Sequence, residues 1–455
     1  MDKNRQIEIM NKIYQGAWVT IVALGATSAH SGIPRIRPNS MLPLRSNQAS
    51  CVWNGTRLMA TLPTLSQQAA KSKWQTRAWT YQEAILSPRC LFFTEDQVYF
   101  ECNSIQCCES IDESNSAYHQ IPATDRLSML YSCVCHGGSQ NAIGKGVFRD
   151  PLATSRVERE WLTKKNRFER YAELVEVYST KEMTFSSDTL NALSGVLQQL
   201  TYVCFPAGCY WGLPVDILPF ALLWQHRGSQ IRRLEFPSWS WAGWKGELFS
   251  AGINGSSTYQ PPFKAWRAET TAFNTELVLL YEDPQKRWED WAPGYDPILD
   301  MASTSNHASL ATLTLSSGED LSQTLFVEAI VFEPQNLLDH SGKSPSSGQW
   351  EVFGPNTVIC KINQVTCMFW CQHSQTKRQF LRGNPSLLLI GRKWYSYVGW
   401  GYDFLLICPI TGMGGDKAVR LGRVRMHFGP EYTHNESCHM VFTAENSRLM
   451  LIGLL

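Results

Sequence analysis

The sequence lacks the features that identify several large classes of protein. Its 41 Lys and Arg residues balance 40 Asp and Glu residues, so no excess charge would draw it to nucleic acid or to acidic lipid. No apolar run approaches the roughly 18 residues of a membrane-spanning helix. The N-terminal segment MDKNRQIEIMNK also lacks the hydrophobic region of a signal peptide. We therefore expect a cytoplasmic protein with no membrane span and no nucleic-acid partner.

The fourteen cysteines lack the spacing of a metal or redox site. No Cys-x-x-Cys pair is present, so we expect reduced thiols. Tetrahedral zinc needs four converging donors, and the closest clusters match no familiar arrangement. These clusters are Cys102 with Cys107 and Cys108, Cys133 with Cys135 and His136, and Cys367 with Cys371 and His373. We predict no metal site; a metal-dependent nucleic-acid binder that uses these clusters and the tryptophans stays open as a further class.

Common enzyme signatures are missing as well. The chain has no Gly-x-Gly-x-x-Gly, no phosphate-binding loop, no Gly-x-Ser-x-Gly elbow and no His-Glu-x-x-His. What it does have is apolar material for buried cores, with 44% hydrophobic and 12% aromatic residues in 455. A chain of this length is expected to form about two or three domains.

The most informative stretch is residues 74–102, WQTRAWTYQEAILSPRCLFFTEDQVYFEC. Trp79, Glu83 and Leu86 fall at helical spacing, and Ser87-Pro88 ends the helix because proline disfavours helix in the residue before it. Residues 90–94 then predict a strand, and residues 97–102 alternate apolar and polar side chains as a half-buried strand does.

This stretch resembles the closing block of the fungal heterokaryon-incompatibility (HET) domain, R-G-W-T-x-Q-E-x-x-L-S-P-R-x-L-x-F. The one visible departure is Ala78 in place of the usual glycine. The matching residues are Arg77, Trp79, Thr80, Gln82, Glu83, Leu86, Ser87, Pro88 and Arg89. The chain is thereby identified as a fungal HET-domain protein.

The N-terminal residues resemble a segment further inside the same domain. Residues 5–14 predict an amphipathic helix with Ile9, Met10 and Ile13 on its apolar face. Residues 17–24 are continuously apolar, which is typical of a strand covered on both faces. The resemblance places two further strand-bearing blocks upstream, so we expect a HET domain that begins part-way through, from a truncated gene model or a degenerate copy. Residues 27–68 are expected to be irregular.

The middle of the chain predicts a helical layer. Apolar faces recur over residues 168–178 and 190–200, and residues 214–225 predict a third helix. The block FPSWSWAGW follows, with Trp239, Trp241, Gly243 and Trp244, and also resembles a companion segment of HET domains. In a strand, Trp239 and Trp241 would share one face. They form either a stacking platform for bases or sugars or, as we favour, an aromatic plug in a core.

Strand patterns dominate from residue 258 onward. The predicted strands are residues 312–315, 325–332, 352–370, 386–390, 404–408 and 421–426. The fold class is therefore mixed α+β: a partial, TIR-like α/β HET domain in residues 1–110, a helical region in residues 111–250, and an antiparallel β-rich region in residues 251–455.

The resemblance also carries the functional expectation. HET domains are held to be similar in fold to TIR domains, some of which cleave NAD through one glutamate, and Glu83 and Glu8 are the candidates. Glu83 beside Trp79 would gain a raised pKa through desolvation. We favour the plainer interpretation, a helix-surface carboxylate paired with Arg77 or Arg89. The prediction is thus a non-catalytic factor without cofactor, acting through protein partners in fungal non-self recognition and programmed cell death. The alternative is an NAD-cleaving enzyme.

Overall fold

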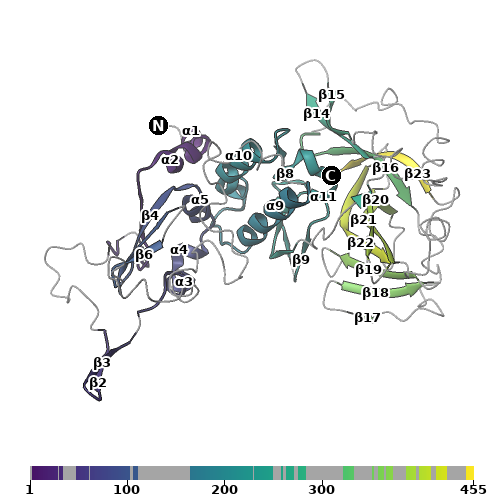
Figure 1. The fold of residues 1–455 in the computed structure, drawn as a ribbon. Coiled ribbons are helices and arrows are strands. Elements are labelled where there is room, and N and C mark those ends of the chain that lie inside the picture. Colours follow the sequence, from purple (N-terminus) through teal and green to yellow (C-terminus); the bar gives the residue numbers. More distant parts are fainter. Residues whose placement is uncertain are drawn as a thin grey trace. The chain divides into compact units, whose positions relative to one another are not determined.

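The computed structural model contains two compact units, shown in Figure 1. Residues 1–163 and Glu173–Pro206 form the N-terminal unit, and Lys164–Ala172 with Ala207–Leu455 form the C-terminal unit. The structure describes residues 3–28, 30–33, 48–60, 62–102, 106–110, 164–228, 230–249, 258–259, 263–270, 275–282, 321–332, 351–352, 357–362, 365–371, 386–395, 399–410, 417–427 and 447–455. The predicted strand at residues 312–315 lies outside these ranges.

The N-terminal unit is built on a four-stranded sheet of order β1-β4-β5-β6. Its strands are β1 (Thr20–Ala23), β4 (Arg89–Phe93), β5 (Val98–Cys102) and β6 (Gln106–Cys108). β1 runs parallel to β4, whereas β4, β5 and β6 are mutually antiparallel. The predicted strands after Ser87-Pro88 are thus present. The face of β5 that is buried carries Tyr99 and Glu101, not the apolar set of Val98 and Phe100.

Short helices accompany this sheet in the N-terminal unit. They are α1 (Lys3–Glu8), α2 (Met10–Gly16), α3 (Leu65–Lys71), α4 (Lys73–Thr76) and α5 (Ala78–Leu86). A capping box between Thr64 and Gln67 starts α3. Leu65 and Ala69 of α3 pack on Val22, Phe92 and other buried side chains of the sheet. Residues 27–68 are therefore not wholly irregular, because they also contain the hairpin of β2 (Ser50–Trp53) and β3 (Thr56–Met59).

Helix α5 connects the sheet with a helical layer. This layer contains α9 (Lys164–Ser179), the 3-10 turns η1 (Ser186–Asp188) and η2 (Asn191–Leu193), and α10 (Ser194–Val203). The Gln82 side chain is fully buried; its Nε2 lies 2.8 Å from the Met10 sulfur, and its Oε1 accepts from the Gly195 amide at 3.3 Å. A Cβ on Gly195 would meet Leu86 Cδ1 at 2.8 Å and Gln82 Oε1 at 2.9 Å, so a larger residue at this crossing of α5 and α10 would force these two side chains to move.

We predicted that the strand over residues 17–24 is covered on both faces. Within the part of the chain that the structure describes, this prediction is wrong. Val22 and Leu24 are buried, but Trp18, Val19 and Ile21 are 89%, 42% and 56% exposed. Successive side chains of a strand point to opposite faces, and α3 covers only the face that carries Val22. The preceding helix is likewise broken at Ile9 into α1 and α2, and its apolar residues Ile9 and Ile13 are exposed.

The C-terminal unit is dominated by an eleven-stranded sheet. Its main path is β15-β14-β16-β20-β21-β22-β19-β18-β17, with β13 beside β20 and β23 beside β16 and β22. Apart from the parallel β22–β23 contact, the pairing is antiparallel, as predicted. The strands are β13 (Thr258–Tyr259), β14 (Phe263–Thr270), β15 (Thr275–Glu282), β16 (Leu325–Phe332), β17 (Glu351–Val352), β18 (Thr357–Ile362), β19 (Val365–Cys371), β20 (Ser386–Tyr395), β21 (Gly399–Pro409), β22 (Lys417–His427) and β23 (Ser447–Leu454).

The mixed α+β class is confirmed, with one adjustment. The predicted helix over residues 214–225 is shorter, because it consists of the 3-10 turn η3 (Val215–Ile217) and the single-turn α11 (Leu218–Ala221). Apart from Asp216 the segment is buried, and its apolar residues on every side favour no single helical face. The TIR-like relationship and the boundaries at residues 110 and 250 stay predictions. Among the described residues, no helix combines the length and apolarity needed to span a bilayer.

Candidate functional site

Glu83, the predicted catalytic candidate, lies on α5 with its carboxylate half-buried. The carboxylate accepts hydrogen bonds from the Tyr14 hydroxyl and the Trp74 indole, and the Arg77 guanidinium attracts it. Burial nevertheless raises the pKa of Glu83, because desolvation outweighs these three interactions. Burial and the Glu83 charge together raise the pKa of Tyr14 as well. The two groups form one coupled pair that connects α2 with α5.

The indole that contacts Glu83 differs from the predicted one. We expected Trp79, one helical turn before Glu83, whereas the structure uses Trp74 from α4. Arg89 is also directed elsewhere, because its Nη1 lies 3.5 Å from the Trp18 carbonyl oxygen. The second candidate, Glu8, is exposed at the C-terminal end of α1.

Other residues of the same motif tie chain segments together. The Thr80 hydroxyl donates to the backbone carbonyl oxygens of Trp74 and Arg77. The Ser87 hydroxyl lies 2.6 Å from the Glu83 carbonyl oxygen and 2.7 Å from the Thr20 hydroxyl, which attaches the end of α5 to β1. The sequence pattern alone does not specify these hydrogen bonds of Thr80 and Ser87. The motif therefore fixes α5 against α4 and the sheet.

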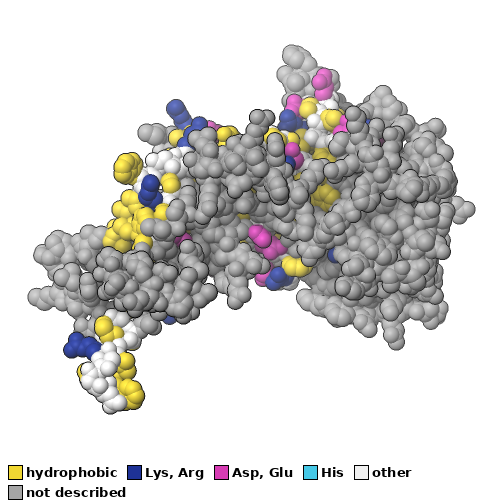
Figure 2. All heavy atoms as spheres, viewed as in Figure 1, with side chains coloured by type: hydrophobic (Ala, Val, Ile, Leu, Met, Phe, Trp, Pro, Cys, Tyr) yellow, Lys and Arg dark blue, Asp and Glu magenta, His cyan; other side chains and the backbone are white. Residues whose placement is uncertain are grey.

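An exposed apolar surface lies on β1 and just before it. We call Trp18, Val19 and Ile21 the apolar strip. The register aligns Ile21 with the half-buried Leu91 of β4 and Phe100 of β5, on the face opposite α3. Figure 2 shows hydrophobic side chains gathered over this part of the N-terminal unit. Large apolar side chains exposed in one short segment are a feature that interaction sites share.

Comparison with known proteins identifies the N-terminal region. Residues 1–83 match the family model described as Heterokaryon incompatibility protein (HET). This region is part of a HET domain. No curated protein matches the chain, and no solved structure matches it. The matched residues run from the N-terminus of the chain to Glu83. They therefore include the Tyr14–Glu83 pair and the apolar strip.

The second tryptophan block lies outside the HET match and has a different backbone from the one predicted. Trp239 and Trp241 are not in a strand; Trp241 begins the 3-10 turn η4 (Trp241–Gly243), and Trp239 precedes it. The strand interpretation fails because Ser240 caps this turn by accepting from the Ala242 amide. A Cβ on Gly243 would lie 2.3 Å from the Pro237 carbonyl oxygen, so the tight turn requires glycine.

Both indoles are plugs in the core of the C-terminal unit. Trp239 is fully buried, stacks on Tyr210 at 5.6 Å and donates to the Gln323 carbonyl oxygen at 2.9 Å. Trp241 donates to the Tyr171 hydroxyl at 2.8 Å. Neither ring is accessible to a base or a sugar, so the described structure supports the core interpretation and not the stacking platform. Trp244 is half-buried, and its indole donates to the Ser238 carbonyl oxygen.

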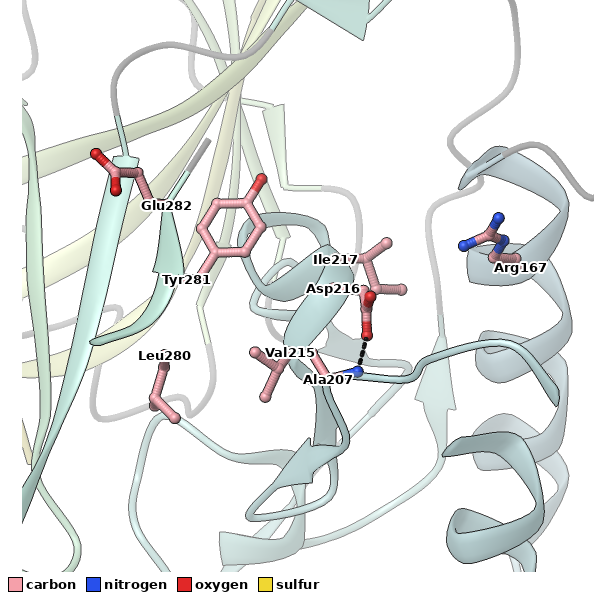
Figure 3. Close-up of a pocket in the computed structure, with 8 residues that line it drawn as sticks. All are labelled: Arg167, Ala207, Val215, Asp216, Ile217, Leu280, Tyr281 and Glu282. Carbon is pink, nitrogen blue, oxygen red and sulfur yellow. Dashed lines mark hydrogen bonds between the residues drawn. The ribbon is translucent and has the colours of Figure 1, made fainter. Parts of the chain in front are cut away.

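A pocket of about 250 Å³ lies in the C-terminal unit, and Figure 3 shows the residues around it. Its lining residues are Arg167, Ala207, Val215, Asp216, Ile217, Leu280, Tyr281 and Glu282. Asp216 accepts from the Ala207 amide at 3.0 Å, and Glu282 pairs with Lys264 at 2.9 Å. Both carboxylates thus have structural partners. No residue that the sequence analysis singled out lines this pocket.

The cysteine clusters are only partly described. Cys102 ends β5, and Cys107 and Cys108 lie in β6; all three are reduced. The positions of Cys133, Cys135, His136 and His373 lie outside the described residues. Within the described ranges, no group of three or more His, Cys, Asp or Glu side chains is arranged to hold a metal ion.

Sequence reasoning missed a buried charge cluster on β21 and β22. The Asp403 carboxylate bridges Arg423 at 2.6 Å and Arg425 at 2.8 Å. The two arginines lower the pKa of Asp403 to about 2, although burial alone would raise it. Nearby, the Arg420 guanidinium stacks on Trp224 at 3.6 Å. The local signal was limited to Arg423-x-Arg425, because arginines at strand spacing inside an otherwise apolar run require buried partners, whereas the partner Asp403 is not encoded locally.

Proposed function

We propose that this HET-domain protein is a non-catalytic, cytoplasmic signalling factor in fungal non-self recognition and programmed cell death, and that it acts by binding protein partners. The observation that carries the proposal is the apolar strip. Its three side chains are 42–89% exposed in the HET region, although other apolar side chains of the same sheet, such as Val22 and Phe92, are buried. Trp is strongly enriched among the residues that dominate the energy of protein interfaces.

The hydrogen bonding of Glu83 supports the same proposal. Donors from two other helices give this carboxylate a structural role, and its remaining lone pairs stay able to accept a proton. The Glu83 carboxylate already accepts from Tyr14 and Trp74, which come from two other helices. We assign to it the positioning of α2 against α5, and hence of the β1 segment that follows α2.

Expression in a filamentous fungus tests this function. We expect the wild-type chain to cause growth arrest and death, and Glu83→Gln to keep that effect because glutamine has the size of glutamate and retains one accepting oxygen. The double variant Trp18→Ala/Ile21→Ser should lower the fraction of dying cells at least tenfold at equal protein level. Leu234→Ser, at an apolar residue 80% exposed in the C-terminal unit, is the matched control and should kill like the wild type.

Two results would refute the proposal. One is death that persists at wild-type frequency in the Trp18→Ala/Ile21→Ser variant. The other is a wild-type chain that leaves growth unchanged at an expression level confirmed by immunoblot.

The NAD-cleaving enzyme stays as a second candidate because of one observation. Burial raises the pKa of Glu83, and perturbed carboxyl groups cluster at functional sites. Under this function Glu83 would contact the dinucleotide, and NAD would be the bound substrate. The two functions therefore differ in what Glu83→Gln does to nicotinamide release.

A further inference from the structure

The pocket of the C-terminal unit receives charged side chains from three separate elements. Arg167 comes from α9, Asp216 from η3 and Glu282 from the end of β15, and η3 packs against β15. In Figure 3, Arg167 lies on one side and the β15 residues lie on the other, with the η3 residues between them. All the lining residues belong to this one unit. The fold of the C-terminal unit therefore brings separate charges to one cavity.

The rest of the wall is mostly apolar. Val215 and Ile217 are buried, and the Tyr281 ring is held edge-on against Phe263 at 6.0 Å. Sites for small molecules combine such walls with a few polar groups, and those for drug-sized ligands measure roughly 300–1,000 Å³. The volume of about 250 Å³ is smaller and corresponds to about eight molecules of liquid water. It suits a ligand the size of one amino acid and not a dinucleotide.

The charged groups determine which ligand chemistry fits. The Asp216 carboxylate accepts from the Ala207 amide at 3.0 Å and is joined to no cation among the described residues. Glu282, in contrast, is paired with Lys264 at 2.9 Å. An apolar ligand would remove water from Arg167 and Asp216 without replacing its hydrogen bonds. A cation would be repelled by Arg167 and an anion by Asp216, whereas a zwitterion complements both.

We propose that this pocket binds a free amino acid with an apolar side chain. The α-carboxylate pairs with Arg167, whose guanidinium can bind both carboxylate oxygens. The α-ammonium pairs with Asp216, and the apolar side chain lies against Ile217 and Tyr281. The pocket lies outside residues 1–83, so this inference goes beyond the proposed function of the HET region and does not rest on it.

Isothermal titration calorimetry of the full chain with L-phenylalanine tests the inference. We expect saturable binding of one molecule per chain. Affinity should fall at least tenfold for phenethylamine, which lacks the carboxylate, for 3-phenylpropionate, which lacks the ammonium, and for L-serine, which lacks the apolar side chain. Arg167→Gln should remove the preference for phenylalanine over phenethylamine. Asp216→Asn should remove the preference over 3-phenylpropionate, because each variant lacks the charge that reads the missing group.

Two exposed charges of the same unit that do not line the pocket provide matched controls. Arg227→Gln and Glu276→Gln should bind phenylalanine like the wild type. Absence of saturable binding, equal binding of phenethylamine or 3-phenylpropionate, or an equal loss of affinity in the controls would overturn the inference. Far-UV circular dichroism checks that each variant folds. Where Asp216→Asn is unfolded, the half-buried Arg167 decides the outcome alone, because a preference that survives Arg167→Gln also overturns the inference.

Discussion

Replacing Asp403 with alanine is expected to lower the free energy of unfolding of the C-terminal unit by about 3–5 kcal/mol. Asp403 is the shared partner of Arg423 and Arg425, whose side chains are 1% and 11% exposed. Without the carboxylate, two guanidinium groups remain in a low-dielectric environment without this counter-charge. The measurement is unfolding in guanidinium, followed by hydrogen exchange of the backbone amides in β21 and β22. These amides report on the C-terminal unit separately from the N-terminal unit.

The same cluster predicts a pH dependence. The folded-state pKa of Asp403 is about 2, below its ordinary value of 3.8. Its contribution to stability is therefore fully present above about pH 4 and is lost as pH falls through about 2. Stability of the wild type should decline more steeply than that of Asp403→Ala between these values.

Glu247→Ala provides the control for this prediction. Glu247 pairs with Arg227 at 3.6 Å, but both side chains are more than half exposed. An exposed ion pair contributes at most about 1 kcal/mol. If Asp403→Ala and Glu247→Ala lower the free energy of unfolding by the same amount, the Asp403 cluster does not stabilise the unit in the way described.

Trp239→Ala is the second substitution with a large expected effect, about 3–5 kcal/mol on the free energy of unfolding of the C-terminal unit. The indole is fully buried against Tyr210, and its removal also leaves the Gln323 carbonyl oxygen without its donor. Chemical denaturation followed by near-UV circular dichroism measures the loss. Trp239→Phe keeps most of the apolar area but not the hydrogen bond, so its cost should be roughly 1–3 kcal/mol.

Trp18→Ala is the matched tryptophan control. Its side chain is 89% exposed, so the free energy of unfolding should change by less than about 0.5 kcal/mol. A large loss at Trp18 together with a small one at Trp239 would show that the burial of the two indoles is assigned the wrong way round.

The sequence predicted the elements whose signals are local. Helical spacing over α5, the Ser87-Pro88 stop and the alternating strands β4 and β5 lie within thirty residues and need no distant partner. The segments β16, β20, β21 and β22 were also predicted, because apolar runs bounded by turn residues specify strands wherever they pair. The HET resemblance rested on the same short block.

What the sequence could not supply was the environment of each side chain. Ile21 and Val22 are both β-branched and apolar, yet one is exposed and the other buried, because burial depends on α3, more than forty residues away. Trp74 replaces Trp79 as the indole on Glu83 for a similar reason: the turn between α4 and α5 decides which ring reaches the carboxylate.

The backbone of the tryptophan block was mispredicted because side-chain capping competed with strand propensity. Alternation of Trp239 and Trp241 is typical of a strand, but Ser240 closes a turn that places both indoles in the core by another route. The Asp403 cluster joins residues about twenty positions apart through the register of β21 and β22, which no local pattern encodes.

Nicotinamide release from NAD by the purified chain tests the central claim that Glu83 holds helices together and performs no chemistry. We expect the wild type and Glu83→Gln to release nicotinamide at the same rate as buffer, across pH values on both sides of the raised Glu83 pKa. Release by the wild type that Glu83→Gln abolishes, in a variant with unchanged circular dichroism, would contradict the account and establish the enzyme.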